Sequence, residues 1–548
     1  MTDAPGPLRP ALFAFFGALT AAYAFLFIRN PSPFFADDSF FYLEVGRNFA
    51  LGYGSTFNRL MPTNGYHPIW MLLCALVYKF VPGRVAGLHV IAALIVALNL
   101  AVLAMTARLL TRLRAPVWLA WALLIPFLFG LQLGTESSIS ATMLAATMLA
   151  LWHFMDRPGW GWALAFNLFA AFAVLSRLDS IFVIACLWIG VLAWAIQNRE
   201  RSPALRIHLA SIPVYAVLWG AYIGSNLYWF GIFMPISGLL KSNNGHDHRF
   251  GHNLPHTALL ALAICAVSLL VLWRRRHDRW FWFAELPFFI GVVLHAGYIT
   301  LRMTSETRWT WYYTSWALLA ALTGARAFAA LFSRPAETAL KSRSLQSAAL
   351  AGALLLSLLL FWRIGLRHSR QRTAEFATIP AMRTALAQAG VERVLAYDQP
   401  GAMAYFTRLA VVPLDGLMAD RAFQTELATH GIGAFIARDH VQGFVGPPVP
   451  LGQWGHDTYC GHLFLESTRY FCAPWQPDAS GQPQWMITGV EVYSRLPLAP
   501  AGRIALQPGN IVWTGKDYVT VWRIPPPAAA PGAGTPDFGN RTPVTESK

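Results

Sequence analysis

The chain has 548 residues, of which 55% are hydrophobic and 13% are charged. An average soluble domain has roughly 45–50% apolar and about 25% charged residues, so this composition excludes disordered, fibrous and small disulfide-stabilised proteins. The net charge of +15 fits a membrane protein whose basic residues set its orientation, and it does not indicate nucleic-acid binding.

Apolar tracts along the chain are long enough to cross a membrane as helices. A crossing helix needs about 20 mostly apolar residues, and about 11 tracts meet this description. They occupy residues 11–28, 85–107, 116–133, 137–154, 160–176, 180–197, 207–230, 257–273, 280–301, 311–332 and 344–362. We therefore expect a mainly α-helical, polytopic membrane bundle.

The apolar segment at residues 68–80 is too short to cross and stops before Pro82 and Gly83, so it is predicted to lie in the membrane interface. With this assignment, every basic cluster between spans falls on one side, at residues 108–114, 157, 199–206, 274–279 and 334–343. Cytoplasmic loops carry such an excess of Lys and Arg. We expect a bacterial inner-membrane protein whose first loop (29–84) and residues after 362 face the periplasm.

The sequence divides into a transmembrane region (1–365), a periplasmic α/β domain (366–524) and a tail (525–548). In the second region, strands are predicted at residues 394–397, 410–413 and 434–437 and a helix at 422–429, an alternation typical of α/β units. Cys460 and Cys472 lie in a compartment that permits disulfides, so we predict that they pair. The tail is rich in Pro, Gly and Ala and is predicted to be disordered.

Asp37 and Asp38 form an acidic pair shortly after the first span. One interpretation is helix capping, because an Asp before a helical run is a good N-cap. The other is chemical, because a carboxylate whose pKa is raised by a neighbouring carboxylate suits a general base. The sequence favours a capping role for one of the two and a chemical role for the other.

The rest of the first loop contains R-N-F-A-L-G-Y-G (47–54), F-N (57–58) and G-Y-H-P-I-W (65–70). With the acidic pair, it resembles the first extracytoplasmic loop of GT-C superfamily glycosyltransferases. The resemblance is closest to bacterial arabinofuranosyl- and mannosyl-transferase-like members, which use polyprenyl-phosphate sugars. Weaker similar segments are G-T-E (134–136), L-S-R-L-D-S (175–180), P-I-S-G-L-L-K (235–241), D-Q-P-G-A (398–402) and L-D-G-L (414–417). His67 replaces the Thr or Ser common in relatives, which leaves the sugar and the acceptor open.

The resemblance implies an inverting glycosyltransferase that moves a sugar from a lipid-linked donor to a hydroxyl of an extracytoplasmic glycan, lipid or protein acceptor. By position, Asp37 would be the base and Asp38 its neighbour. Candidate ligands of the donor phosphate are Lys241, Arg308, Arg302 and Arg177, although cations near helix ends also extend to lipid phosphates. Candidate substrate-binding residues are Tyr66, His67, Asn64, Ser237 and Tyr312. Glu136 and Asp179 are expected to pair with an arginine such as Arg177.

Three alternatives remain open. A glycan ligase using a lipid diphosphate would need additional cations near the site. A transporter or flippase of lipid-linked sugars would place ionisable residues near the centres of spans. An inactive assembly partner would keep the fold without the chemistry.

No cofactor or metal site is predicted. The cluster of His246, Asp247, His248 and His252 is assigned to a loop. A divalent cation bound at Asp38 is the one metal alternative that stays open.

Overall fold

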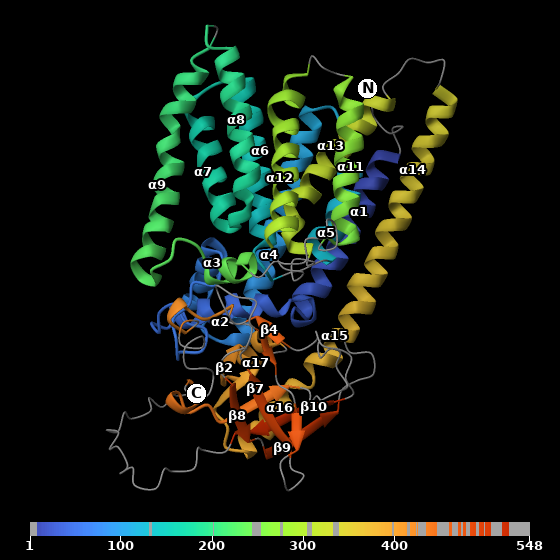
Figure 1. The fold of residues 1–548 in the computed structure, drawn as a ribbon. Coiled ribbons are helices and arrows are strands. Elements are labelled where there is room, and N and C mark those ends of the chain that lie inside the picture. The colour runs from blue at the N-terminus through green and yellow to red at the C-terminus, as the bar shows by residue number, and fades with distance from the viewer. Residues whose placement is uncertain are drawn as a thin grey trace, which may run out of the picture.

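A computed structural model places most of the chain (Figure 1). It describes residues 8–130, 134–200, 202–243, 254–274, 278–303, 310–332, 339–396, 399–413, 417–423, 425, 435–446, 460–462, 470–472, 475–477, 483–488, 493–497, 499–505 and 518–524. The predicted tail at 525–548 and most of the predicted helix at 422–429 lie outside these residues.

Long apolar helices form a bundle whose colours run from blue at α1 through green to yellow at α14 (Figure 1). They are α1 (Leu8–Arg29), α4 (Arg84–Arg112), α5 (Val117–Gly130), α6 (Ser137–Asp156), α7 (Trp160–Ser176), α8 (Ile181–Gln197), α9 (Ala204–Phe230), α11 (His256–Trp273), α12 (Leu286–Arg302), α13 (Thr314–Phe332) and α14 (Ala339–Leu360). Short helical turns join them: η2 (Leu178–Ser180) and η5 (Thr310–Tyr313) are 3₁₀ turns, and η3 (Phe281–Glu285) and η7 (Phe361–His368) are π-helical.

Within the described residues, 9 helices are long and apolar enough to cross a membrane. They coincide with nine of the predicted tracts, and the shorter apolar helices Val117–Phe129 and Trp160–Ser176 coincide with the other two. The predicted multi-pass helical architecture is therefore confirmed, while the total of eleven crossings stays a prediction.

The first loop forms a compact layer at one end of the bundle (Figure 1). It contains η1 (Ser32–Phe34), α2 (Asp37–Ala50) and α3 (Pro68–Phe80). Pro68 is suited to the first turn of α3, where its missing N–H has no helical partner. A Cβ on Gly46 would lie 2.9 Å from the Cβ of Cys74, so only glycine lets α2 approach α3 this closely. The short segment 68–80 is thus a helix of the first loop that packs against α2.

The carboxy-terminal region contains α15 (Ser369–Phe376), α16 (Ile379–Gln388), α17 (Pro400–Thr407) and two sheets. The first sheet has the order β2 (Ala410–Pro413), β1 (Arg393–Ala396), β3 (Gly443–Gly446), β10 (Tyr518–Arg523) and β9 (Ala499–Ala505). Strand β1 is parallel to β2 and β3, whereas β10 is antiparallel to β3 and β9. Helix α17 connects the parallel strands β1 and β2, so this part is an α/β unit as predicted.

The second sheet is antiparallel and was not predicted. It has the order β4 (Cys460–His462), β5 (Tyr470–Cys472), β7 (Pro483–Thr488) and β6 (Trp475–Pro477), with β8 (Tyr493–Pro497) paired to β7. Strands β4, β5 and β6 have only 3 residues each, too few to give a clear alternation of apolar and polar residues, which is the signal that sequence reading relies on.

The predicted strand at 434–437 is wrong, because residues 435–438 form a helical turn. The N–H of Asp439 donates to the carbonyl of Phe435 at 2.9 Å, and His440 ends the turn with a φ of 49°. Phe435 and Ile436 are both buried. A short apolar run fits a buried helical turn and a buried strand equally well. The strand that pairs with β1 in the first sheet is instead β3, at residues 443–446.

The register of β4 and β5 places Cys460 directly opposite Cys472. We predict that thiol labelling of the denatured, unreduced protein modifies three cysteines, Cys74, Cys186 and Cys265, which are free in the structure. After reduction, labelling should modify all 5. Five labelled cysteines before reduction would contradict the disulfide.

Candidate functional site

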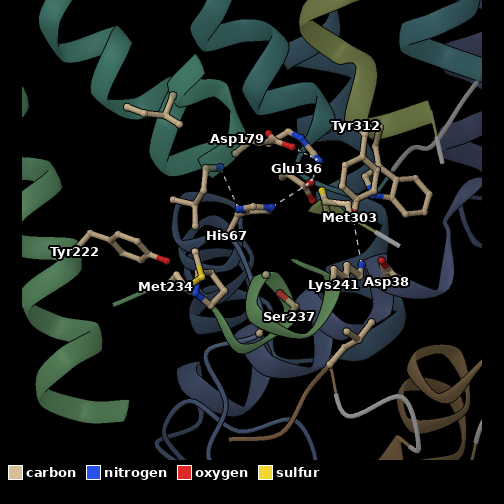
Figure 2. A pocket seen from close by; sticks show the side chains of 18 of the residues that line it. Asp38, His67, Glu136, Asp179, Tyr222, Met234, Ser237, Lys241, Met303 and Tyr312 are labelled. Atoms are coloured by element: carbon tan, nitrogen blue, oxygen red, sulfur yellow. Dashed lines mark hydrogen bonds and ion pairs between the residues drawn. The ribbon is translucent and has the colours of Figure 1, made fainter. Parts of the chain in front are cut away.

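A cavity of about 320 Å³ lies where the first loop meets the end of the bundle (Figure 2). Its polar and charged lining residues are Asp38, Tyr42, His67, Glu136, Arg177, Asp179, Tyr222, Ser237, Lys241, Tyr298 and Tyr312. The charged ones come from the first loop, the starts of α6 and α8 and the segment after α9. These are the connections predicted to share one side of the membrane, and the structure brings them together.

Arg177 is the centre of the charged cluster. Its guanidinium donates to Glu136 at 2.5 Å and to Asp179 at 2.8 Å, and it lies 4.3 Å from the centroid of the Tyr312 ring. Burial alone would lower the pKa of Arg177, but Asp179 and Glu136 raise it above the ordinary value. The predicted pairing of Arg177 with these carboxylates is found, so its charge is largely compensated within the protein.

His67 connects the first loop to this cluster. Its Nδ1 accepts a hydrogen bond from the N–H of Leu178 at 3.3 Å, and its Nε2 lies 3.7 Å from a carboxylate oxygen of Glu136. Burial lowers the pKa of His67, although Glu136 opposes this effect. A neutral ring with the proton on Nε2 satisfies both contacts, and His67 then positions Glu136.

The cluster continues into the bundle through His295, a residue that sequence reasoning missed. The Nε2 of His295 lies 3.1 Å from Asp179, and its Nδ1 accepts a hydrogen bond from the indole N–H of Trp316 at 3.2 Å. Both His295 and Trp316 are buried. An ionisable residue within an apolar tract was the available signal, since such residues are usually functional or paired.

Asp38, Lys241 and Tyr312 line one side of the cavity (Figure 2). The ammonium group of Lys241 donates to the Tyr312 hydroxyl at 3.2 Å. Lys241 belongs to α10 (Ile236–Asn243) and Asp38 to the first turn of α2. A carboxylate and an ammonium group from separate elements therefore share this side, next to Ser237.

Asp37 has a different position from Asp38. Its carboxylate accepts hydrogen bonds from the N–H of Gly401 at 3.1 Å and of Ala402 at 2.7 Å, and it does not line the cavity. These donors belong to the first turn of α17, where N–H groups lack helical partners. Asp37 thus caps a helix of the carboxy-terminal region and attaches that region to the first loop.

The carboxy-terminal region also forms part of the cavity wall. Leu417 and Met418 line the cavity, and a Cβ on Gly65 would lie 1.9 Å from the carbonyl oxygen of Leu417. Only glycine permits this contact. The region therefore closes the cavity on the side away from the bundle.

The opposite flank of the cavity is apolar and aromatic. It is lined by Trp219, Tyr222 and Ile223 of α9, Phe182 of α8 and Tyr298 of α12. Helix α9 is largely exposed and lies at the edge of the bundle (Figure 1). The cavity thus combines a charged end with an apolar flank beside a membrane-facing helix.

Three further predicted site residues, Asn64, Tyr66 and Arg302, lie outside the cavity lining. The amide of Asn64 binds the side chain of Asn226 at 3.1 Å and the N–H of Ile236 at 3.1 Å, so it fixes the segment after α9. The Tyr66 hydroxyl lies 2.5 Å from the Ser55 hydroxyl, outside the cavity lining. Arg302 is exposed and also outside the lining. Arg308 lies outside the described residues.

Among the described residues, no group of three or more His, Cys, Asp or Glu side chains could hold a metal ion. The sequence cluster at 246–252 lies outside them.

Comparison with known proteins gives no family-model match and no match among curated proteins. Two structures of Archaeoglobus fulgidus oligosaccharyltransferase are similar. One, archaeal AglB with an inhibitory peptide and a dolichol-phosphate, has 11% identity and a TM-score of 0.47, covering 89% of this chain and 76% of that chain. The other, tethered to an acceptor peptide with an NVT sequon, has 12% identity and a TM-score of 0.45, covering 88% and 76%. At such low identity and TM-score, function has to be argued from the cavity.

The attachment of α17 through Asp37 should depend on pH. Burial raises the pKa of Asp37 to about 7 from an ordinary value of 3.8, against the lowering effect of the two N–H groups. The folded protein therefore binds this proton more tightly, and the free energy of unfolding should fall as pH rises from about 4 to about 7, by up to about 1.4 kcal/mol per pH unit.

Thermal unfolding of the wild type and Asp37→Asn across this range measures that contribution. Asparagine keeps one acceptor oxygen but does not titrate. The free energy of unfolding of Asp37→Asn, measured relative to that of the wild type, should therefore increase as pH rises. A difference that is independent of pH would contradict the assignment.

Proposed function

We propose that the protein is an inverting glycosyltransferase that takes a sugar from a polyprenyl-phosphate donor. The observation that carries this proposal is the cavity, in which a carboxylate and a lysine lie at the end of an aromatic flank facing the membrane. An amphiphilic donor with an anionic headgroup matches this combination of surfaces. The resemblance of the first loop to GT-C enzymes agrees with it.

Asp38 is the general base in this proposal, because Asp38 lines the cavity while Asp37 is bound to α17. Asp38 takes the proton of the acceptor hydroxyl as its oxygen attacks the anomeric carbon. The bond between that carbon and the phosphate oxygen breaks, and the lipid phosphate leaves with the electron pair. A positioned base of this kind typically contributes about 10²–10⁴ in rate.

Lys241 stabilises the departing phosphate, with Tyr312 holding its ammonium group. Fixed positive charge where negative charge develops is the main source of such stabilisation. The other described cation lining the cavity is Arg177, which already binds two carboxylates. This supply of positive charge favours a lipid monophosphate over a diphosphate donor.

The cavity also favours an enzyme over a transporter. Its charged lining residues belong to helix ends and connections: Asp38 lies in the first turn of α2, Glu136 precedes α6, and Arg177 follows α7. His295 of α12 contacts Asp179 but does not line the cavity. A transport path would need ionisable groups along the spans. The carboxy-terminal region, which contributes Leu417 and Met418 to the wall, would contact the glycan, lipid or protein acceptor.

The proposed orientation places the cavity and the carboxy-terminal region on the periplasmic side of a bacterial inner membrane. The basic clusters between spans then face the cytoplasm, as the positive-inside rule requires.

The two neighbouring carboxylates allow a matched test of the base. Asp38→Asn should reduce transfer from polyprenyl-phosphate sugars by about 10²–10⁴, whereas Asp37→Asn should retain most activity. Transfer is measured with purified protein and a panel of radiolabelled donors. Near-wild-type activity of Asp38→Asn, with loss in Asp37→Asn, would assign the base to Asp37 instead.

Lys241→Gln should reduce kcat/KM for the donor by about tenfold to a hundredfold, since it removes a charged contact to phosphate. Arg302→Gln is the control, because Arg302 is exposed and outside the cavity lining. Equal losses in both variants would show that net charge, and not the position of Lys241, is responsible.

A further inference from the structure

A second cavity lies at the opposite end of the bundle from the candidate site. It is an open groove of about 650 Å³ between the last part of α8 and the segment that contains η3 and the start of α12. Helix α8 begins beside Arg177 and ends at Gln197, and α12 runs back toward the candidate site. The groove is therefore separate from the proposed chemistry.

The groove has an apolar floor at a close helix crossing. A Cβ on Gly190 would lie 2.5 Å from the carbonyl oxygen of Phe283, so α8 and η3 are in backbone contact there. Ile189 and Ile290 line the groove and expose 67% and 46% of their surface. η3 is π-helical, and such turns are frequent at functional sites.

The length of the groove matches one leaflet of a membrane. Its lining residues on α8 extend from Cys186 to Gln197, which at 1.5 Å per helical residue is about 16 Å. This is about half of the roughly 30 Å hydrocarbon thickness of a bilayer. An acyl chain of one leaflet would fill the groove from its apolar part to its polar end.

The polar end of the groove carries Arg279 together with Gln197. The neighbouring carboxylates, Asp278 and Glu285, are both bound by Arg326 of α13. Arg279 itself is exposed and has no ion-pair partner within the part of the chain that the structure describes. The groove therefore ends at an exposed guanidinium that no described carboxylate binds, at the level where a lipid headgroup would lie.

We propose that this groove binds an anionic phospholipid of the leaflet opposite the candidate site, with one acyl chain between α8 and α12 and its phosphate at Arg279. The leaflet is the one that faces the basic loops in the proposed orientation. A basic residue near the surface of an anionic leaflet contributes about 1 kcal/mol of attraction, which corresponds to about a fivefold preference.

The proposal is tested by native mass spectrometry of the full-length protein in detergent, with equal amounts of phosphatidylglycerol and phosphatidylethanolamine of matched acyl chains. We expect the wild type to bind more phosphatidylglycerol than phosphatidylethanolamine. In Arg279→Gln, the ratio of bound phosphatidylglycerol to bound phosphatidylethanolamine should be about fivefold lower. Arg274→Gln removes the same charge from an exposed residue at the same end that does not line the groove, and it should keep the wild-type ratio.

A second variant tests the acyl-chain site. Ala193→Phe fills the groove at a lining residue and should lower the occupancy of both lipids. If that variant does not give monodisperse protein, Ile290→Trp at the exposed rim serves the same purpose. Equal binding of the two lipids to the wild type, equal loss in both arginine variants, or unchanged occupancy in the filled groove would each overturn the proposal.

Discussion

The buried guanidinium of Arg177 is the interaction on which the cavity end of the bundle depends. It binds Glu136 at the start of α6 and Asp179 before α8, and it lies against the Tyr312 ring at the start of α13. Asp179 is shared with His295 of α12. A buried charge is stable only when it is paired, and removing one partner leaves the others uncompensated. One arginine therefore holds four helix ends in a single arrangement.

The adjacent carboxylates Asp37 and Asp38 have different surroundings because their side chains leave α2 in different directions. Asp37 reaches the first turn of α17, while Asp38 lines the cavity beside Lys241 and Tyr312. The first residue joins the carboxy-terminal region to the first loop, and that region in turn supplies Leu417 to the cavity wall. The carboxy-terminal region that Asp37 binds therefore also forms part of the cavity wall.

The two ends of the bundle present different charge environments. At one end, Arg177 is paired with Glu136 and Asp179, and Lys241 and Asp38 line the same cavity. At the other, Asp278 and Glu285 are bound by Arg326, and Arg279 faces an apolar groove. In a low-dielectric interior, charges are confined to such paired clusters or to the ends of spans. These charged clusters accordingly lie toward the two ends of the bundle, with His295 of α12 extending one of them into it.

The sequence by itself determined the helical tracts, because hydropathy and length decide whether a segment can cross a membrane, and it predicted a separate short apolar segment at 68–80, which forms α3. It also identified the carboxylate pair and the pairing of Arg177. Only the tertiary structure decided which of Asp37 and Asp38 lines the cavity, that Asn64 and Tyr66 lie outside the cavity lining, and that residues 435–438 are helical. These depend on contacts between residues far apart in the chain, such as Asp37 with Gly401 or His295 with Asp179, and local sequence patterns carry no information about such distances.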